Sequence, residues 1–437
     1  MNTTGKPQRF SHAFSLVGIL VASVVLLAAS SRQWVDVAGV GTWERIVFRL
    51  MMGYLVLVSA RTACLVVLSF ADRFFRQAIP PLTSFPLVSV LVPCFNEQDV
   101  VEKAVRSILK LDYPNFEVLV IDDGSTDQTL RLAHDLRSEK RVRVIHQRNQ
   151  GKAAALNRGI LEAYGEFVLC VDADSLLHPG VLRFGLPYFD RDPKLAAVAG
   201  AVHVGNPHNL ITAFQRLEYV VGLNFHKTAQ SFLSVVTIVP GPVGLFRKDA
   251  IRGIGGYRSD TFAEDCDLTI RLLMAGHHAV YCDRMIAVTE APDEFESLIK
   301  QRYRWSRGTL QAIKVNARWL FHPWKSPRNF AILSYLFLET LIIPCANFLF
   351  AMVFVQQSIA STGMGGLSPF FIQLTLLDTI LAAYSVLFEH EVGALVFLSL
   401  VNRLTYGLAM EILRFFSILD ELIGLPMNWN KLQRKGL

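Results

Sequence analysis

Two aspartates stand one residue apart directly after an apolar run. Residues 169–171 read Leu-Cys-Val, and Asp172-Ala173-Asp174 follow. Carboxylate oxygens suit Mg²⁺ or Mn²⁺, and Mg²⁺ usually takes only one or two protein carboxylates together with the phosphates of its substrate. The pair therefore indicates a metal-bound diphosphate ligand more than a closed structural metal site, although an isolated pair of this kind is also common in solvated loops and helix caps.

The middle of the chain alternates short apolar runs with helical patterns. The apolar runs cover residues 87–92, 116–121, 142–145 and 167–171, and helical patterns cover residues 100–111 and 152–163. This alternation predicts βαβ units, and so an α/β domain with a mainly parallel sheet that is buried on both faces. In such a sheet, ligands bind at the carboxyl ends of the strands.

Polar clusters stand at these predicted strand ends. They are Asn96-Glu97, Asp122-Asp123 and Asp172-Ala173-Asp174. We expect the clusters to meet in one cleft, where crowded carboxylates would repel each other without a cation or a hydrogen-bond donor. The neighbouring residues Ser125, Thr126 and Asp127 are interpreted instead as helix caps.

Lys152 follows Gly151 at the start of the predicted helix 152–163. A lysine in this place opposes the helix dipole, which favours anions at the N-terminus. A bound diphosphate would resolve the conflict, because the helix N-terminus and the ammonium group both attract it.

Two later motifs allow more than one interpretation. Glu264 and Asp265 begin a helical stretch, where they either complement the helix dipole or supply a general base. Gln301, Arg304 and Trp305 combine planar hydrogen-bond donors with an aromatic ring, which suits ligand binding. An amphipathic helix at a membrane surface would look similar, because Trp and Arg both favour that depth.

The composition argues against a purely soluble protein. Of the 437 residues, 52% are hydrophobic, and the mean hydropathy is +0.35. Apolar runs long enough to cross a bilayer cover residues 13–30, 50–71, 330–355, 367–388 and 392–419. We therefore expect membrane regions at residues 1–83 and 324–437, with two helices in the first and about three hydrophobic segments in the second. The globular domain between them, residues 84–323, ends in interfacial helices.

The distribution of basic residues predicts the orientation. The run 13–30 is interpreted as a retained helix, with a signal sequence as the alternative. In either case the second segment crosses inward, and Arg73 and Arg76 lie in the cytosol. Three later crossings would put Lys431, Arg434 and Lys435 outside, against the positive-inside rule. The conflict eases if the last segment is re-entrant or interfacial. We expect a multi-pass protein of the plasma membrane, the bacterial inner membrane, with a cytoplasmic domain.

Charges inside the apolar runs require partners. They are Arg61, Glu339, Asp378, Arg403 and Glu411. Such groups normally face a protein interior or a wet cavity, so they either line a conduit for a hydroxyl-rich product or join helices through salt bridges. The net charge of +6 is mild and no nucleic-acid motif is visible, so a nucleic-acid partner is not expected. Six cysteines without Cys-x-x-Cys spacing argue against a zinc site or a disulfide framework.

Five motifs resemble, in order and rough spacing, those of the family 2 processive glycosyltransferases. This family includes cellulose, chitin and hyaluronan synthases and poly-β-1,6-N-acetylglucosamine synthases. The motifs are Val92-Pro93-Cys94-Phe95-Asn96-Glu97, Asp122-Asp123-Gly124-Ser125, Asp172-Ala173-Asp174, Glu264-Asp265 and Gln301-x-x-Arg304-Trp305. Together they cover about residues 85–325. Each motif alone is weak evidence for the family, but the five motifs in this order are highly specific to it.

The resemblance implies a Rossmann-like GT-A fold, flanked by transmembrane helices, that uses a UDP-sugar with Mg²⁺ or Mn²⁺. It assigns substrate binding to Asn96, Glu97, Asp122, Asp123, Lys152 and Asp172. It assigns the metal to Asp174 with Asp172. Asp265, with Glu264 beside it, would be the catalytic base, and Gln301, Arg304 and Trp305 would form the platform for UDP and the acceptor sugar.

The implied activity is inverting, processive polymerisation of a UDP-sugar into an exported polysaccharide. The branch that the chain resembles most uses UDP-N-acetylglucosamine, but Ala263 stands where many members have Thr or Gly, and this leaves the sugar open. The implied partners are the UDP-sugar, the growing glycan chain and membrane lipid, with room for a small accessory membrane protein. Two alternatives remain: a non-processive transferase that adds one sugar to a lipid or other carrier, and a non-catalytic membrane scaffold or transporter.

Overall fold

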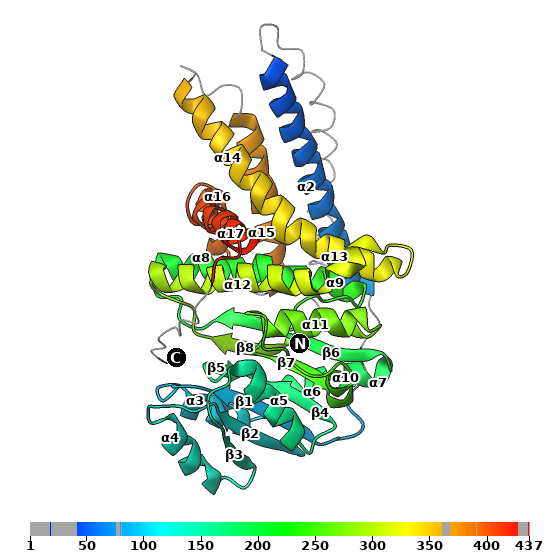
Figure 1. Ribbon diagram of the computed structural model, residues 1–437, viewed down its shortest axis with the longest axis vertical. Helices are drawn as coiled ribbons and strands as arrows, with labels where there is room; N and C mark the ends of the chain where they lie inside the picture. Colours follow the sequence, from blue (N-terminus) through cyan, green and yellow to red (C-terminus); the bar gives the residue numbers. More distant parts are fainter. Residues whose placement is uncertain are drawn as a thin grey trace.

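A computed structural model describes residues 18, 42–75, 79, 81–360, 368–389, 391–426 and 436. The expected first membrane segment, residues 13–30, lies outside the described residues apart from position 18, as do Arg76, Lys431, Arg434 and Lys435. Figure 1 shows three tiers: an α/β domain, a set of helices lying across it, and a bundle of upright helices on the other side of these crossing helices.

The α/β domain contains one sheet of eight strands in the order β3-β2-β1-β4-β7-β6-β8-β5. The strands are β1 (Val88–Cys94), β2 (Phe116–Asp122), β3 (Val142–His146), β4 (Phe167–Cys170), β5 (Ser175–Leu177), β6 (Leu195–Val204), β7 (Gly244–Arg247) and β8 (His278–Thr289). Strands β3, β2, β1 and β4 are parallel. Strand β7 runs antiparallel to β4 and to β6, and β5 runs antiparallel to β8. The sheet is therefore mixed, and the predicted parallel pairing describes its first half.

Strands β1, β2 and β4 are buried on both faces, as their apolar runs predict, whereas the edge strand β3 is only partly buried. Val88, Val90 and Val92 of β1 face one hydrophobic cluster, and Leu91 faces another, as the two-residue period of a strand requires. The helices around the sheet are α3 (Val101–Leu109), α4 (Thr129–Asp135), η2 (Leu136–Ser138), α5 (Lys152–Glu162), α6 (Val181–Gly185), α7 (Pro187–Arg191), α10 (Lys248–Gly253) and α11 (Glu264–Met274). Helices α3, α6 and α7 contribute to the first cluster, and α5, α10 and α11 contribute to the second.

A layer of helices separates the sheet from the upright bundle (Figure 1). It consists of α8 (Leu210–Glu218), η3 (Tyr219–Phe225), α9 (His226–Phe232), α12 (Phe295–Asn316), η4 (Ala317–Phe321) and α13 (Pro327–Phe337). Buried ion pairs tie the layer together and to the bundle: Arg302 of α12 lies 2.8 Å from Glu218 of α8, and Arg307 lies 2.8 Å from Glu421.

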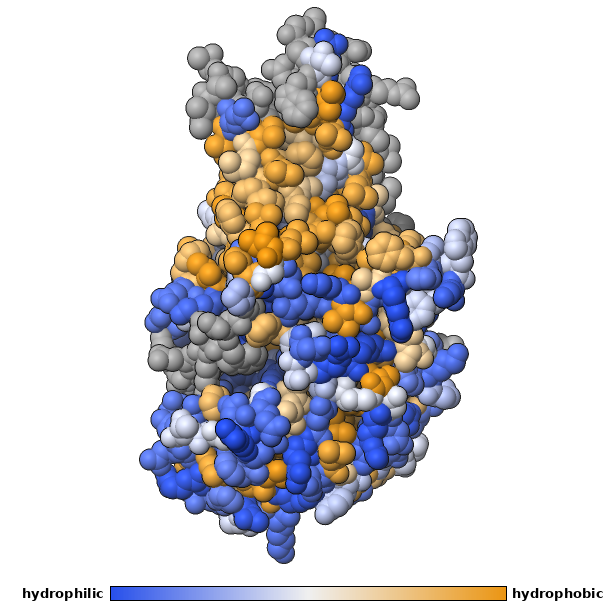
Figure 2. All heavy atoms as spheres, in the orientation of Figure 1, coloured by the Kyte–Doolittle hydropathy of each residue, from blue (hydrophilic) through white to orange (hydrophobic). Residues whose placement is uncertain are grey.

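The upright bundle is apolar on its outside (Figure 2). Its upright helices are α2 (Thr42–Phe75), η5 (Leu338–Ile342), α14 (Ile343–Ala360) and α15 (Ser368–Glu389). Helices α16 (Ala394–Asn402) and α17 (Tyr406–Leu422) lie at its base, beside the crossing helices (Figure 1). In the described residues, the stretches Arg45–Phe75, Pro327–Gln356 and Phe370–Glu389 are long and apolar enough to cross a membrane. They correspond to the expected segments 50–71, 330–355 and 367–388.

The last apolar run is broken. Helices α16 and α17 meet at an angle of 53°, so the expected segment 392–419 is either one bent span or a re-entrant pair. Arg403, at the break, lies 2.6 Å from Asp378 of α15. Arg61 of α2 forms an ion pair with Glu339. Within the described residues, these pairs join helices to one another, which favours the salt-bridge interpretation of the charges in the apolar runs.

Candidate active site

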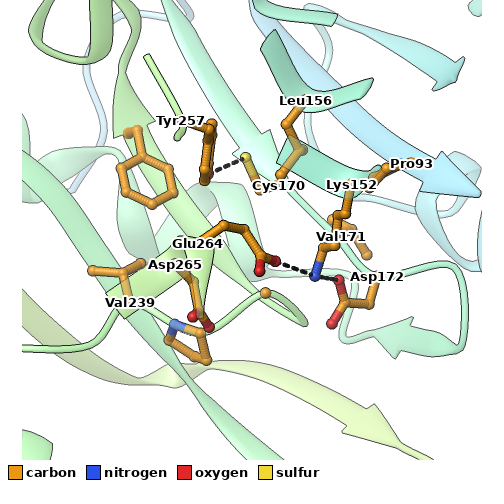
Figure 3. A pocket seen from close by; sticks show the side chains of 13 residues that line it. Pro93, Lys152, Leu156, Cys170, Val171, Asp172, Val239, Tyr257, Glu264 and Asp265 are labelled. Atoms are coloured by element: carbon orange, nitrogen blue, oxygen red, sulfur yellow. Dashed lines mark hydrogen bonds and ion pairs between the residues drawn. The ribbon is translucent and has the colours of Figure 1, made fainter. Parts of the chain in front are cut away.

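A pocket lies where the carboxyl ends of β1 and β4 meet the start of α11 (Figure 3). Its lining comes from segments that are far apart in the sequence: Pro93, Lys152, Leu156, Cys170, Val171, Asp172, Val239, Pro240, Gly241, Phe246, Tyr257, Glu264 and Asp265. Four predicted site residues, Lys152, Asp172, Glu264 and Asp265, are thus brought together. The other predicted residues do not line this pocket: Asn96, Glu97, Asp122, Asp123, Asp174, Gln301, Arg304 and Trp305.

The Lys152 ammonium group is the centre of the charged cluster. Its Nζ lies 2.6 Å from Asp172 Oδ1 and 3.1 Å from Glu264 Oε1 (Figure 3). Burial opposes the charged ammonium group, but the carboxylates around it outweigh burial and hold the pKa of Lys152 well above its usual value. Lys152 is also the first residue of α5, and Gly151 before it has a φ of +89° that favours glycine. The Lys152 side chain therefore stays protonated at a helix N-terminus, between two carboxylates.

Asp265 lies on the other side of the pocket, towards Val239 (Figure 3), and Pro240 also lines the pocket. Burial raises the pKa of its carboxyl to about 6, and the neighbouring Glu264 carboxylate adds to the rise. Two groups lower the pKa of Asp265 and so oppose this rise. They are Lys152 and the N–H of Cys266, which donates to Asp265 Oδ1 at 2.7 Å. A carboxyl group that changes protonation state this close to neutral pH is suited to general base catalysis.

Gly241 closes the pocket over the ion pair between Lys152 and Asp172. A Cβ atom at this position would lie 2.7 Å from Asp172 Oδ2 and 2.8 Å from Lys152 Nζ. Real Cβ contacts are not this short, so only glycine fits here without moving the charged groups. The loop is held in turn by the N–H of Val239, which donates to the Thr269 hydroxyl at 3.1 Å.

Tyr257 forms the wall opposite the charged cluster, and sequence analysis missed it. Its hydroxyl group lies 3.3 Å from Cys170 Sγ. Asn157 of α5 holds its backbone from both sides: Asn157 Oδ1 accepts from the Tyr257 N–H, and Asn157 Nδ2 donates to the Tyr257 carbonyl, each at 2.8 Å. The preceding Gly255 and Gly256 have φ values of +83° and +77°. This glycine pair was the only sequence signal of the turn, and it does not show which helix the turn contacts.

Asp174 lies just beyond the pocket. Its Oδ1 accepts from the Ser175 hydroxyl at 3.0 Å and from the Thr289 hydroxyl at 3.4 Å. Among the described residues, no group of three or more His, Cys, Asp or Glu side chains could hold a metal by itself. Asp172 and Asp174 are both only partly buried. This donor set fits a cation that takes one or two carboxylates and completes its shell with ligand phosphates, as Mg²⁺ does.

Asp123 stabilises a loop. Its Oδ1 accepts from Gln147 Nε2 at 2.8 Å and from the Gln150 N–H at 3.0 Å, and its Oδ2 accepts from the Gly151 N–H at 2.8 Å. Asp122 is fully buried and lies 2.7 Å from His146 Nδ1. Both carboxylates therefore shape the segment that leads into Lys152.

Asn96 also connects two strand ends. It has a φ of +53°, its N–H donates to the Ser125 hydroxyl at 2.9 Å, and its Oδ1 accepts from the Thr126 N–H at 2.7 Å. The N–H of Glu97 donates to the Thr129 hydroxyl at 2.7 Å. The loops after β1 and β2 are thus held against each other by the residues of the first two motifs.

Gln301, Arg304 and Trp305 lie on α12, outside the pocket. Gln301 is buried and accepts a hydrogen bond from Arg302, whose guanidinium group lies 4.1 Å from the centre of the Trp305 ring. Helix α12 packs very closely against the segment before Glu264. A Cβ atom on Gly308 would lie only 2.6 Å from the Ala263 nitrogen. Helix α12, which carries Gln301, Arg304 and Trp305, is therefore fixed against the residue that precedes Glu264 and Asp265.

Comparison with known proteins places this geometry in a family. A sequence profile described as "Glycosyltransferase like family 2" matches residues 86–308. The poly-beta-1,6-N-acetyl-D-glucosamine synthases of Staphylococcus epidermidis and Staphylococcus aureus are each 31% identical over 222 residues, which is 51% of this chain and 54% of theirs. The matched part of this chain thus spans about half the length of these relatives.

A solved structure shows the same fold. It is described as mannosyltransferase PcManGT from Pyrobaculum calidifontis in complex with GDP-Man and Mn²⁺, and it aligns with a TM-score of 0.63 at 21% identity over 86% of this chain and 100% of that chain. This confirms the predicted GT-A-like α/β fold. Since the family profile covers about half of the chain, including the whole pocket, this protein belongs to the glycosyltransferase like family 2.

Proposed function

We propose that this protein is an inverting β-glycosyltransferase that transfers a sugar from a UDP-sugar to a glycan. The observation that carries the proposal is the pairing, in one pocket, of a carboxyl group with a pKa of about 6 and a partly buried cluster around a charged lysine. The carboxyl group provides a base for the acceptor hydroxyl, and the lysine provides a positive charge for the leaving diphosphate.

In the proposed reaction, the acceptor hydroxyl attacks the anomeric carbon from the face opposite UDP. The new C–O bond forms as the bond to the diphosphate breaks, and the configuration at the anomeric carbon inverts. Asp265 takes the proton of the attacking hydroxyl. Lys152, at the N-terminus of α5, faces the negative charge that develops on the diphosphate, and Glu264 keeps the ammonium group in place through their 3.1 Å contact.

A divalent cation, Mg²⁺ or Mn²⁺, fits the donor set at Asp174 and Asp172. Asp174 is the better ligand of the two, because Asp172 Oδ1 already contacts the Lys152 ammonium group at 2.6 Å. A bound cation would supply further positive charge to the diphosphate. The Mn²⁺ complex named for the Pyrobaculum structure is consistent with this choice.

The donor is proposed to be UDP-N-acetylglucosamine, and the product a polymer that is exported. The names of the staphylococcal relatives support the sugar. Gln301, Arg304 and Trp305 are proposed to bind UDP and the acceptor sugar from α12, close to the segment that carries Asp265. A pyranose ring would stack on the Trp305 face through its apolar C–H groups, and Asn96, Glu97, Asp122 and Asp123 would support the nucleotide side of the cleft.

The domain division is proposed as residues 1–83 and 324–437 in the plasma membrane and residues 84–323 in the cytoplasm. Three candidate spans and the apolar outside of the upright bundle support it (Figure 2). The cytoplasm supplies sugar nucleotides to the pocket. The growing glycan and membrane lipid are the proposed partners, and a small accessory membrane protein would act at the bundle.

The test is to reconstitute the full chain and supply a panel of labelled UDP-sugars. We expect a long polymer from UDP-N-acetylglucosamine that depends on Mg²⁺ or Mn²⁺ and is degraded by a β-1,6-specific glycosidase. Asp265→Asn should abolish the product while UDP binding persists. The exposed Asp249, on α10 and outside the pocket, provides the matched control Asp249→Asn. A product of one added sugar would indicate the non-processive alternative, and no transfer from any donor would indicate a scaffold.

A further inference from the structure

A turn of the crossing layer, directly before the candidate span Pro327–Gln356, presents two of its aromatic side chains to the outside. This turn, residues 317–326, comprises η4 and the residues that lead into α13, and we name it the aromatic turn. Trp324 is 94% exposed and Phe321 is 76% exposed, which makes them the two most exposed large hydrophobic residues of the described chain. Trp319 and Leu320 of the same turn pack inward against a hydrophobic cluster. Trp319 and Leu320 therefore hold the turn in place, and the exposed Phe321 and Trp324 do not take part in this packing.

The aromatic turn lies in a strongly basic stretch. Residues 297–338 contain eight lysines and arginines and no aspartate or glutamate. Three of these basic side chains are exposed in or next to the turn: Lys314, Arg318 and Lys325. A surface that combines exposed aromatic rings with unbalanced positive charge complements an anionic lipid surface.

The aromatic turn is fixed in position by hydrogen bonds. The Asn329 N–H donates to the Ser326 hydroxyl, which caps α13, and the Lys325 N–H donates to the His322 carbonyl at 3.1 Å. Arg328 donates to the carbonyls of Leu273 and His277, at 2.6 and 2.8 Å, at the end of α11. The aromatic turn is thus held against the same helix that begins with Glu264 and Asp265.

Its place in the molecule supplies a further argument. The candidate span Pro327–Gln356 begins directly after the aromatic turn. In Figure 1 the turn before α13 projects sideways at the level where the crossing helices meet the upright bundle. In Figure 2 this is the level at which the apolar outside of the bundle gives way to a hydrophilic surface. Aromatic residues of proteins concentrate at this boundary in a bilayer, because one part of the ring system is apolar and another is polar.

We propose that the aromatic turn binds the headgroup layer of an anionic membrane, with Phe321 and Trp324 inserted between lipids and with Arg318 and Lys325 on the phosphate groups. The proposal rests on the membrane part of the proposed function and adds to it a specific lipid contact. Because Arg328 joins the turn to α11, the lipid contact also fixes the orientation of the catalytic helix relative to the membrane.

The experiment places a nitroxide label at Phe321→Cys or at Trp324→Cys, one at a time, so that one aromatic side chain remains. The background carries Cys64→Ser and Cys345→Ser, because the other four cysteines are buried. Labelled full chains are inserted into nanodiscs of phosphatidylglycerol with phosphatidylcholine, or of phosphatidylcholine alone. Collisions with oxygen report contact with lipid, and collisions with a nickel chelate report contact with water.

Two control labels separate this proposal from the membrane proposal. Leu161, on α5, is 74% exposed and lies in the α/β domain, and Leu349, on α14, is 54% exposed in a candidate span. We expect Leu161→Cys to report water, Leu349→Cys to report lipid, and both turn labels to favour oxygen in the anionic discs. Adding Arg318→Gln with Lys325→Gln should move the turn labels towards water while leaving the Leu349 label unchanged.

Three results would overturn the proposal. If the turn labels are as accessible to nickel as the Leu161 label while the Leu349 label reports lipid, the turn does not bind lipid although the chain is embedded. If the turn labels are shielded from oxygen and nickel alike, a protein surface or a second copy of the chain covers the turn instead. If the Leu349 label also reports water, the membrane proposal itself fails.

Discussion

The acidic residues at the sheet edge form two groups that the sequence does not distinguish. Asp122 and Asp123 follow β2, are almost fully buried, and accept hydrogen bonds from the loops beside them. Asp172, Glu264 and Asp265 lie around one ammonium group in a pocket, and Asp265 has a pKa of about 6. Asp123 satisfies both of its oxygens with N–H donors, and Asp122 binds the His146 ring through Oδ2 while its buried Oδ1 has no hydrogen-bond partner among the described residues. The second group instead keeps several carboxyl groups close together around one ammonium group.

The difference supports the proposed assignment of the chemistry to the second group. A carboxylate that accepts backbone N–H bonds stabilises the fold, because burying those donors without partners would cost free energy. A crowded set of carboxyl groups costs folding free energy and persists where a ligand or a reaction requires it. Substitutions in the two groups should therefore differ in what they damage.

Asp265→Asn should give the largest effect on rate. Removing a general base typically costs about 10²- to 10⁴-fold in rate. In the folded protein the carboxyl has a pKa of about 6 instead of 3.8, so its contribution to stability falls as the pH rises through this interval. The variant should therefore be at least as resistant to urea at pH 7 as the parent protein. A large loss of stability would assign Asp265 to the first group.

Gly241→Ala should reduce activity by about 10²-fold, because displacing reacting groups by about 1 Å can have this effect. The added Cβ atom would lie within 3 Å of both Lys152 and Asp172. Gly253→Ala is the matched control, since no atom lies within 4 Å of the corresponding Cβ position. Turnover and thermal unfolding of both variants are the measurements. Equal turnover in the two variants would show that the ion pair can move without consequence.

The pH profile of kcat/KM should show an acidic limb near pH 6, with a fall of about tenfold for each unit below it. Below this pH, Asp265 is protonated and cannot accept the proton of the acceptor. Lys152 lowers the pKa of Asp265, so Lys152→Gln should move the limb to higher pH. A limb that stays in place in this variant would assign the titration to another group.

Asp123→Ala should destabilise the fold by about 1–3 kcal/mol, because the N–H groups of Gln150 and Gly151 lose their acceptor. Urea unfolding at pH 7 measures this change. The parallel variant Asp172→Ala should have a smaller effect on stability and a larger effect on turnover. If the two variants lose stability equally, the division between the two groups is wrong.

Gln311→Leu should have the smallest effect, a loss of stability of about 0.5–1.5 kcal/mol with a modest fall in kcat. Gln311 Oε1 accepts from the Phe262 N–H at 3.1 Å, and Gln311 Nε2 donates to Glu421 at 3.1 Å. It thus connects α17 to the segment that precedes Asp265. Gln311→Glu keeps the acceptor for Phe262 and should retain more of kcat. Equal kcat in both variants would show that this contact does not position Asp265.

The sequence predicts the first half of the sheet closely. The apolar run 116–121 became β2 almost residue for residue, because a strand buried on both faces leaves a continuous apolar signal. The run 142–145 also became a strand, β3, although it lies at the edge of the sheet and is only partly buried. The antiparallel strand β7, with four residues, was not predicted. A strand this short has no recognisable period, and its place between β4 and β6 depends on contacts across the sheet.

Side-chain partners were harder to predict than positions. The pattern placed Lys152 and Asp265 at helix starts, where α5 and α11 begin. It did not show that Asp123 accepts hydrogen bonds from the loop 147–151. These bonds depend on the path of the loop, and the only sequence signal of that path is Gly151. The charge distribution indicated that the last segment could be re-entrant or interfacial, but not where it bends, since an apolar composition fits a straight span and a bent one equally well.

The ion pairs of α12 have a consequence for shortening the chain. Arg302 and Arg307 are 4% and 3% exposed. Arg307 pairs with Glu421, and Glu218, the partner of Arg302, also accepts a hydrogen bond from Tyr406 at 2.6 Å. A fragment that stops at residue 323 would keep both arginines but lose these C-terminal partners, leaving buried charge uncompensated. Expressing the catalytic region as a separate soluble piece should therefore require replacing Arg307 or retaining α17.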